Sequence, residues 1–297
     1  MTGRPVSATA GAASLAHRHA PTLLALGAIV LWGALAPIGV SLRHVPPFLL
    51  TGLGLLVGSL IGLALSGWRI SSWKVPLSTL GLGICGLFGY HFLLFTALRL
   101  APPVQANLLN YLWPLGIVLM APLFLPGMHL RAAHVVAALV GFVGAALAIV
   151  GDSSKVGLQG DFAWGYLAAL GAAFMWASYS LLTQRVAPFA SAAIGLFGLV
   201  SGLLSLACHA LLEVPVVLSG RDWGLVLAMG AGPLGAAFYL WDAALKRGDA
   251  RHIGLLSFLT PLLSTLALLW VRNEAPSASV AAAGVLIVGA ALLGSRA

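Results

Sequence analysis

Long apolar runs, almost free of charged residues, recur along this chain. Each is long enough for a helix to cross the hydrocarbon core of a bilayer, which is about 30 Å thick and takes roughly 20 residues. The connections between the runs are too short for a separate soluble domain. We therefore predict an all-α integral membrane protein with ten transmembrane helices, at residues 22–42, 48–66, 75–98, 104–125, 131–150, 162–184, 189–212, 222–246, 251–271 and 277–294.

Composition excludes the soluble classes of protein. Charged residues make up 7% of the 297 residues and the mean hydropathy is +1.03, whereas an average soluble domain carries about 25% charged residues. A transmembrane β-barrel would show short segments in which polar and apolar residues alternate, but these runs are continuous. The 36 glycines favour helices that pack closely within the membrane.

The formal charge of +8 comes from basic residues that stand singly in short connections, which argues against nucleic acid as a partner. Lys and Arg are enriched in cytoplasmic loops. If the N-terminus is cytoplasmic, ten basic residues lie inside (Arg4, Arg18, Arg69, Lys74, Arg131, Arg185, Lys246, Arg247, Arg251 and Arg296) and five lie outside (Arg43, Arg99, Lys155, Arg221 and Arg272). We therefore predict cytoplasmic N- and C-termini and, with no organelle signal, a bacterial inner membrane.

Neither metal nor disulfide chemistry is indicated. Cys85 and Cys208 lie within apolar runs, where cysteine is usually a small buried residue. The histidines in the tail and at span ends, such as His129 and His134, lack the spacing of metal ligands. We therefore expect no metal, no cofactor and no catalytic residue.

The chain repeats itself. Residues 92–115, FLLFTALRLAPPVQANLLNYLWPL, align without a gap with 239–262, YLWDAALKRGDARHIGLLSFLTPL, at an offset of 147 and with eight identities in 24 positions. A second match pairs LGAIVLW with LGAAFMW, which end at Trp32 and Trp176.

This repetition predicts a tail at 1–21, a first five-helix repeat at 22–150 and a second at 162–294. Because five is odd, the second repeat must be inverted in the membrane. Transporters built this way bind their substrate near the midplane, between the repeats.

These features resemble a known family. The ten spans, the LWG of the first span and the AL(R/K)…P hairpins after spans three and eight resemble the drug/metabolite transporter (DMT) superfamily, EamA type. NYLWPL at 110–115 is similar to the YddG aromatic amino acid exporters. The resemblance implies a basket in which spans one to four and six to nine surround a central cavity, with spans five and ten at the periphery. It also implies amino acids and related metabolites as exported substrates.

The fourth span carries a candidate substrate site. Asn107, Asn110, Tyr111 and Pro114 share one helix face, at spacings i, i+3, i+4 and i+7. Lipid cannot host unpaired carboxamides, so this face meets either another helix, through hydrogen bonds, or a hydrated cavity. Carboxamides both donate and accept, which suits a zwitterion.

Aromatic residues deep in other spans extend this candidate site, with ordinary core packing as the alternative for each. Rings in a cavity wall would contact Phe, Tyr, Trp or Met side chains. The predicted substrate-binding set is Trp32, Tyr90, His91, Asn107, Asn110, Tyr111, Trp113, Trp176, Tyr179, Phe238, Trp241 and Ser257, with Pro114 and Pro261 as flexing points of the gates.

Three titratable residues leave a choice open. His91 is either a proton shuttle or carboxylate ligand, or a satisfied packing residue. Asp242 stands four residues before Lys246, in the order that favours a structural ion pair. The rival is that Asp242 binds an α-ammonium group or a coupling proton.

We therefore predict a secondary transporter that exports aromatic and other neutral amino acids by alternating access, with small-molecule substrates and the lipid bilayer as partners. The alternative is a nucleotide-sugar, drug or other metabolite carrier of the same superfamily. An intramembrane enzyme or a channel is less favoured, since no nucleophilic serine has the required setting. Small residues in spans five and ten, such as Gly141 and Gly294, indicate close packing or a dimer surface, which leaves the oligomeric state open.

Overall fold

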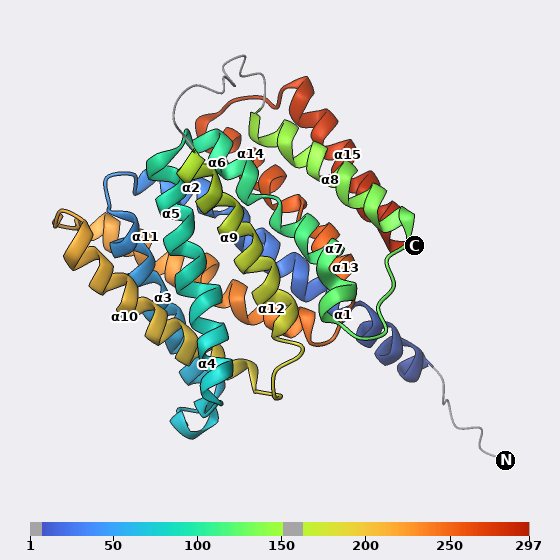
Figure 1. Cartoon of the computed structure of the whole chain (residues 1–297), viewed down its shortest axis with the longest axis horizontal. Helices are drawn as coiled ribbons and strands as arrows, with labels where there is room; N and C mark the ends of the chain where they lie inside the picture. The colour runs from blue at the N-terminus through green and yellow to red at the C-terminus, as the bar shows by residue number, and fades with distance from the viewer. Residues whose placement is uncertain (1–7, 151–162, 297) are drawn as a thin grey trace.

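The computed structural model describes residues 8–150 and 163–296, and this part of the chain is helical without any strand (Figure 1). Arg4 and Lys155, two of the residues counted for membrane orientation, lie outside the described residues, as does the start of the predicted span 162–184.

Ten helical segments of the described chain are long and apolar enough to cross a membrane, which confirms the predicted ten-span, all-α membrane fold. The bounds agree with the predicted ones to within a few residues. The segments are His19–Ser41, Pro47–Leu65, Leu77–Leu100, Pro103–Phe124, Ala132–Val150, Trp164–Leu182, Ser191–Leu212, Gly220–Leu245, Ala250–Arg272 and Ala278–Ser295.

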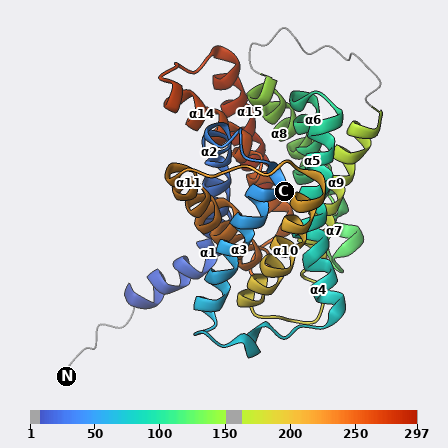
Figure 2. The same ribbon diagram turned by 90° about the vertical axis from the view of Figure 1, so that its left-hand side faces the viewer.

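The described residues form fifteen α-helices, of which eight lie in the first half. They are α1 (Ala8–Gly33), α2 (Leu35–Ser41), α3 (Pro47–Leu65), α4 (Leu77–Ile84), α5 (Tyr90–Leu100), α6 (Pro103–Asn110), α7 (Trp113–Phe124) and α8 (Ala132–Val150). Helix α1 begins before the predicted first span, in an alanine-rich stretch with high helix propensity. Figure 2 shows this start projecting from the bundle.

The second half contains seven. They are α9 (Ala163–Leu182), α10 (Ile194–Leu212), α11 (Gly220–Ala231), α12 (Ala237–Leu245), α13 (Ala250–Leu256), α14 (Leu259–Arg272) and α15 (Ala278–Ser295). Short 3₁₀ turns, η1 (Ile70–Trp73) and η3 (Ser191–Ala193), lie in two connections.

Interruptions inside the spans recur in both halves. A π-helical turn, η2 (Cys85–Gly89), separates α4 from α5, and a second, η4 (Gly232–Ala236), separates α11 from α12. These two turns stand 147 residues apart, as do the starts of α6 and α13. The repeat offset seen in the sequence therefore holds for the local backbone geometry of spans three, four, eight and nine.

Two helix pairs run side by side in both views, α3 with α10 and α8 with α15 (Figures 1 and 2). The first pair meets through glycines. A Cβ atom on Gly62 would lie 2.7 Å from the Cα of Gly195, so only glycine allows this approach. The prediction that both cysteines are buried is wrong for Cys85, whose side chain is exposed on η2, while Cys208 is half-buried.

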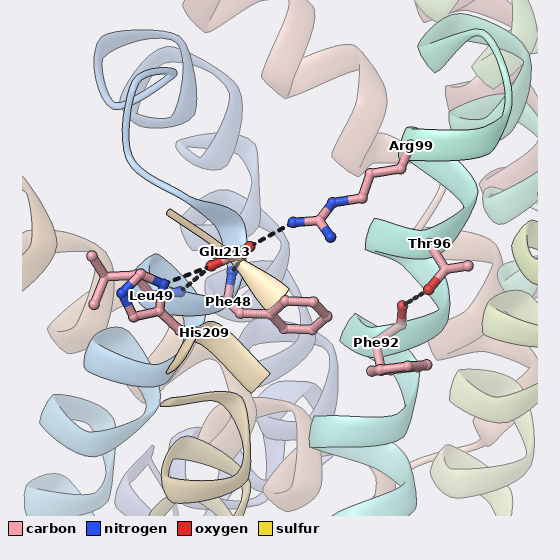
Figure 3. Close-up of polar contacts among 7 residues, drawn as sticks. All are labelled: Phe48, Leu49, Phe92, Thr96, Arg99, His209 and Glu213. Atoms are coloured by element: carbon pink, nitrogen blue, oxygen red, sulfur yellow. Dashed lines mark hydrogen bonds and ion pairs between the residues drawn. The ribbon is translucent and has the colours of Figure 1, made fainter. Parts of the chain in front are cut away.

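Glu213, directly after α10, marks one end of the bundle, which we call the Glu213 end. Its buried carboxylate accepts the backbone N–H groups of Phe48 (3.0 Å) and Leu49 (3.2 Å) in the first turn of α3 (Figure 3). It also pairs with Arg99 Nη2 at 2.9 Å and His209 Nδ1 at 3.0 Å. A carboxylate satisfies the free N–H groups of a helix start and complements its dipole, so Glu213 joins α3, α5 and α10.

The opposite end of α10 holds a second polar cluster, at what we call the Lys246 end. The Nζ atom of Lys246 lies 2.7 Å from Asp242 Oδ2 and 3.0 Å from the carbonyl oxygen of Phe189, and 3.6 Å from the centroid of the Phe189 ring. Ser191 also donates to Asp242. The repeat mates Arg99 and Lys246 thus lie at opposite ends of α10.

Candidate functional site

The fourth and ninth spans break at equivalent places. Helix α6 ends at Asn110 and α7 begins at Trp113, with Pro114 in its first turn. Proline has no N–H group, so the carbonyl of Asn110 loses its usual helical partner. Helix α13 ends before Ser257 and α14 begins at Leu259, two residues before Pro261. Both predicted flexing prolines therefore stand at observed helix breaks, while their gating role stays a prediction.

The two π turns hold side chains of the cavity wall. Trp32 Nε1–H donates to the carbonyl oxygen of Pro233 in η4, at 3.1 Å. His91 Nδ1 contacts the carbonyl oxygen of Leu87 in η2. A carbonyl can only accept, so Nδ1 carries a proton, and in the neutral form of the ring Nε2 is then an acceptor.

These elements enclose a cavity of about 430 Å³, within the roughly 300–1,000 Å³ range of small-molecule sites. Its wall combines aromatic rings with amides and hydroxyls, and contains no Lys, Arg, Asp or Glu. The lining residues are Trp32, Leu35, Ala36, Gly39, Leu50, Thr51, Tyr90, His91, Leu94, Phe95, Leu98, Asn107, Asn110, Tyr111, Trp113, Trp176, Met229, Leu234, Phe238, Thr260 and Ser264.

Nine of the twelve predicted substrate-binding residues lie in this wall. They come from five spans and are Trp32, Tyr90, His91, Asn107, Asn110, Tyr111, Trp113, Trp176 and Phe238. The structure brings them together around one space. Whether they bind substrate remains a prediction.

The other three predicted residues lie behind the wall. Trp241 is 1% exposed and donates through Nε1 to Ser180 Oγ at 3.1 Å. The Ser257 hydroxyl donates to the Ile253 carbonyl within its own helix. Tyr179 packs against the Trp176 ring, with centroids 5.3 Å apart. Each supports or backs a lining element instead of reaching the cavity.

Four tryptophans cluster at the base of the cavity: Trp32, Trp113 and Trp176 line it, and Trp241 packs behind them. We call this group the tryptophan floor. The Trp32 ring centroid lies 5.2 Å from that of Trp241, 5.7 Å from Trp176 and 6.3 Å from Trp113. Most of these pairs are edge-to-face or tilted, which is the favourable geometry for aromatic rings. Away from this floor the wall includes Gly39 and Leu98, which stand near the ends of α2 and α5 at the Glu213 end. The floor therefore lies on the side of the cavity toward the Lys246 end.

Two buried polar atoms of the wall have no hydrogen-bond partner among the described residues. Asn110 donates from Nδ2 to the Tyr90 hydroxyl at 3.2 Å, but its Oδ1 is unpaired. Thr260 Oγ1 is likewise unpaired. Buried polar atoms are seldom left unsatisfied in folded proteins, so each leaves one hydrogen bond unmade in the cavity wall.

Sequence reasoning missed Thr51, Thr260 and Ser264, which also line the cavity. For the second repeat, we assumed that the positions equivalent to Asn107 and Asn110, such as Ser257, would face the cavity. The positions that reach the cavity there are instead the mates of Trp113 and Ile117, namely Thr260 and Ser264. The offset of 147 would have pointed to Thr260, because its mate Trp113 was a predicted site residue, but not to Ser264, whose mate Ile117 does not line the cavity.

The titratable pair Asp242 and Lys246 lies outside the cavity wall, at the Lys246 end. Asp242 is 2% exposed and ion-paired, as the structural interpretation predicted, and its coupling role is not supported by contact with the cavity. Within residues 8–150 and 163–296, no cluster of His, Cys, Asp and Glu is arranged to hold a metal ion.

Comparison with known proteins gives consistent results. Residues 20–150 and 163–296 each match the model of the EamA-like transporter family. The chain is 44% identical to the aromatic amino acid exporter YddG of Ancylobacter novellus, over 92% of this chain and 96% of that protein. It is 28% identical to the aromatic amino acid exporter YddG of Escherichia coli, over 93% and 97% of the two chains. A solved crystal structure matches with a TM-score of 0.88 and 43% identity, over 93% of this chain and 96% of that chain.

Proposed function

The chain belongs to the EamA-like transporter family, and from that premise we propose that it exports neutral amino acids, aromatic ones among them, from the cytoplasm by alternating access. The observation that carries this proposal is the cavity wall. It joins a tryptophan floor to amides and hydroxyls, without a Lys, Arg, Asp or Glu side chain. Such a wall suits an apolar ring at one end of a zwitterion and the two charged groups at the other.

The relatives support the substrate class. Two of them are named aromatic amino acid exporters, and the matches extend over nearly the whole of each chain. A nucleotide-sugar carrier is disfavoured because phosphate recognition relies on Arg or Lys, and the cavity wall contains neither. An enzymatic role is disfavoured because the transporter family gives it no support.

The transport mechanism follows from the asymmetry of the cavity. The tryptophan floor lies on its side toward the Lys246 end, whereas Gly39 and Leu98 of its wall lie near the Glu213 end. The excess of Lys and Arg in the predicted inner segments favours a cytoplasmic position for the Lys246 end. With this orientation, the structure corresponds to an outward-facing state. If the two inverted halves then adopted each other's conformation, the tryptophan floor would open toward the cytoplasm.

A proteoliposome assay tests the proposal. Vesicles loaded with labelled L-phenylalanine should release it saturably, and unlabelled tyrosine or tryptophan should compete. Efflux measured with and without a pH gradient decides whether a proton is coupled. The Asn110→Ala, Tyr111→Ala double variant should lose at least about tenfold of the rate, equivalent to about 1.4 kcal/mol.

Trp164→Ala is a matched control, because Trp164 is 76% exposed and lies outside the cavity wall. It should export at the wild-type rate. No efflux of any amino acid by the wild type, or undiminished efflux by the double variant, would contradict the proposal.

A further inference from the structure

We infer that Asn110 and Thr260 form an ammonium subsite in the cavity, so that substrates are selected through their α-ammonium group and by zero net charge. This inference rests on the proposed function. It adds Thr260 to the recognition site and assigns a direction to the bound zwitterion.

The two side chains share burial, position and an unmet hydrogen-bonding capacity. Asn110 is 3% exposed and Thr260 is 4% exposed, and both line the same cavity. Asn110 Oδ1 and Thr260 Oγ1 have no partner among the described residues. Leaving a buried polar atom unpaired costs about 1–3 kcal/mol, and a ligand that donates hydrogen bonds to both atoms removes this cost.

Both unpaired atoms can accept hydrogen bonds, although the Thr260 hydroxyl can also donate one. The amide nitrogen of Asn110 donates one of its two N–H groups to the Tyr90 hydroxyl, at 3.2 Å, and Oδ1 can only accept. The neutral His91 ring, with Nδ1 donating to Leu87, presents an Nε2 that also accepts. An ammonium group carries three N–H donors and no acceptor, whereas a carboxylate carries no donor. This group of atoms therefore recognises the ammonium end of an amino acid.

The carboxylate end has a neighbouring donor. The Tyr90 oxygen accepts the Asn110 amide proton, so its own O–H is free to donate. No Lys or Arg lines the cavity to neutralise a carboxylate by itself. The ammonium and carboxylate of one substrate must then compensate each other. A side chain with an additional charge would enter this wall unpaired, which is costly, so Lys, Arg, Asp and Glu should be rejected.

Thr260 also makes the two halves of the cavity unequal. It is the repeat mate of Trp113, so a hydroxyl in one half faces the space that an indole lines in the other. An L-amino acid has a ring at one end and two charged groups at the other. If the same residue stood at both positions, the cavity would lose the difference between its two halves that orients the amino acid.

The test compares two ligands and two variants. Binding of L-phenylalanine and of 3-phenylpropanoate is measured by isothermal titration calorimetry on purified protein. The second ligand lacks the ammonium group, so it should bind the wild type more weakly. Thr260→Val removes only the hydroxyl and should weaken L-phenylalanine about tenfold, with 3-phenylpropanoate unchanged. Thr260→Ser keeps the hydroxyl and should restore L-phenylalanine. Equal loss for both ligands, or no loss for L-phenylalanine, overturns the inference.

A second pair of variants examines Asn110. Asn110→Leu removes the acceptor and should weaken the binding of L-phenylalanine by about tenfold. Asn110→Asp retains an acceptor, and it should bind L-phenylalanine at least as well as the wild type does and 3-phenylpropanoate more weakly than the wild type does. Weaker binding of L-phenylalanine by Asn110→Asp, in protein that elutes as wild type on size exclusion, contradicts the subsite.

The wild type separates the two proposals. Wild-type export of L-phenylalanine together with an indifferent Thr260→Val overturns only the subsite. Absence of both binding and export of L-phenylalanine by the wild type overturns the proposed function and the subsite with it.

Discussion

The indole N–H of Trp32 donates a hydrogen bond to the carbonyl oxygen of Pro233, 3.1 Å away and 201 positions along the chain. Pro233 lies in the π turn η4, and such turns shift the register of helical hydrogen bonds and are frequent at functional sites. His91 engages the other π turn, η2, through the carbonyl of Leu87. The π turn of each half therefore contacts a ring of the cavity wall, and both rings come from the first half.

Replacement of Trp32 by Phe should show how much the hydrogen bond to Pro233 contributes to stability. Trp32→Phe keeps an aromatic ring in the floor but removes the hydrogen bond to the Pro233 carbonyl, and such a bond contributes about 1 kcal/mol. We expect a lower melting temperature in detergent. Trp113→Phe is the control, since no hydrogen bond of the Trp113 indole occurs among the described residues; equal melting temperatures for the two variants would refute the effect.

Glu213 should be a stability determinant of the Glu213 end. Glu213→Gln keeps the size of the side chain but removes the charge that pairs with Arg99 and two helix N–H groups. Hydrogen bonds to charged groups contribute about 1.5–3 kcal/mol each, so the melting temperature should fall clearly. Glu274→Gln, at an exposed position of the same end, should melt as the wild type does. A wild-type melting curve for Glu213→Gln would contradict the prediction.

Asp242 should hold the Lys246 end closed. Asp242→Asn weakens the contacts to Lys246 and Ser191, which tie α12 to the connection before α10. A loss of 1 kcal/mol shifts a two-state ratio by about fivefold. We therefore expect maleimide labelling of Thr183→Cys, a buried position near this end, to speed up by about that factor in a background that carries Cys85→Ala and Cys208→Ala.

Asp249→Asn is the matched control for that experiment. Burial raises the pKa of Asp249, but hydrogen bonds from Arg251 hold it below its usual range, so Asp249 is also a paired carboxylate of this end. Asp249 caps the start of α13 and pairs with Arg251 of the same helix, so it does not connect α12 to α10. Labelling should stay at the wild-type rate, and equal acceleration by both variants would mean general loosening.

Hydropathy was sufficient to predict the ten spans, because a membrane imposes a minimum length and an apolar surface on every one of them. It could not predict the interruptions at η2 and η4, whose residues are as apolar and glycine-rich as their neighbours. The proline breaks near Asn110 and Ser257 could be predicted, since proline removes a specific backbone donor.

The candidate site was predictable on the first half and less so on the second. Asn110 and Trp113 were found because polar and aromatic residues are conspicuous inside an apolar span. Thr260 is an unremarkable residue in a helix, since its hydroxyl can bond to its own backbone. Its unpaired state in the cavity wall depends on how α14 packs, which no local pattern encodes. Ser257 shows the converse: its hydroxyl does bond within the helix.

The opposed orientation of the two halves can be tested at one pair of repeat mates, Leu100 and Arg247. Both side chains are exposed, and they stand at the end of α5 and just after α12. In the cysteine-free background, Leu100→Cys should react in intact cells with a membrane-impermeant maleimide. Arg247→Cys should react only after the cells are permeabilised, because the excess of basic residues keeps its connection in the cytoplasm. Labelling of both cysteines from the same side would contradict the inverted repeat. Without that repeat, exchange of conformation between halves could not open the tryptophan floor.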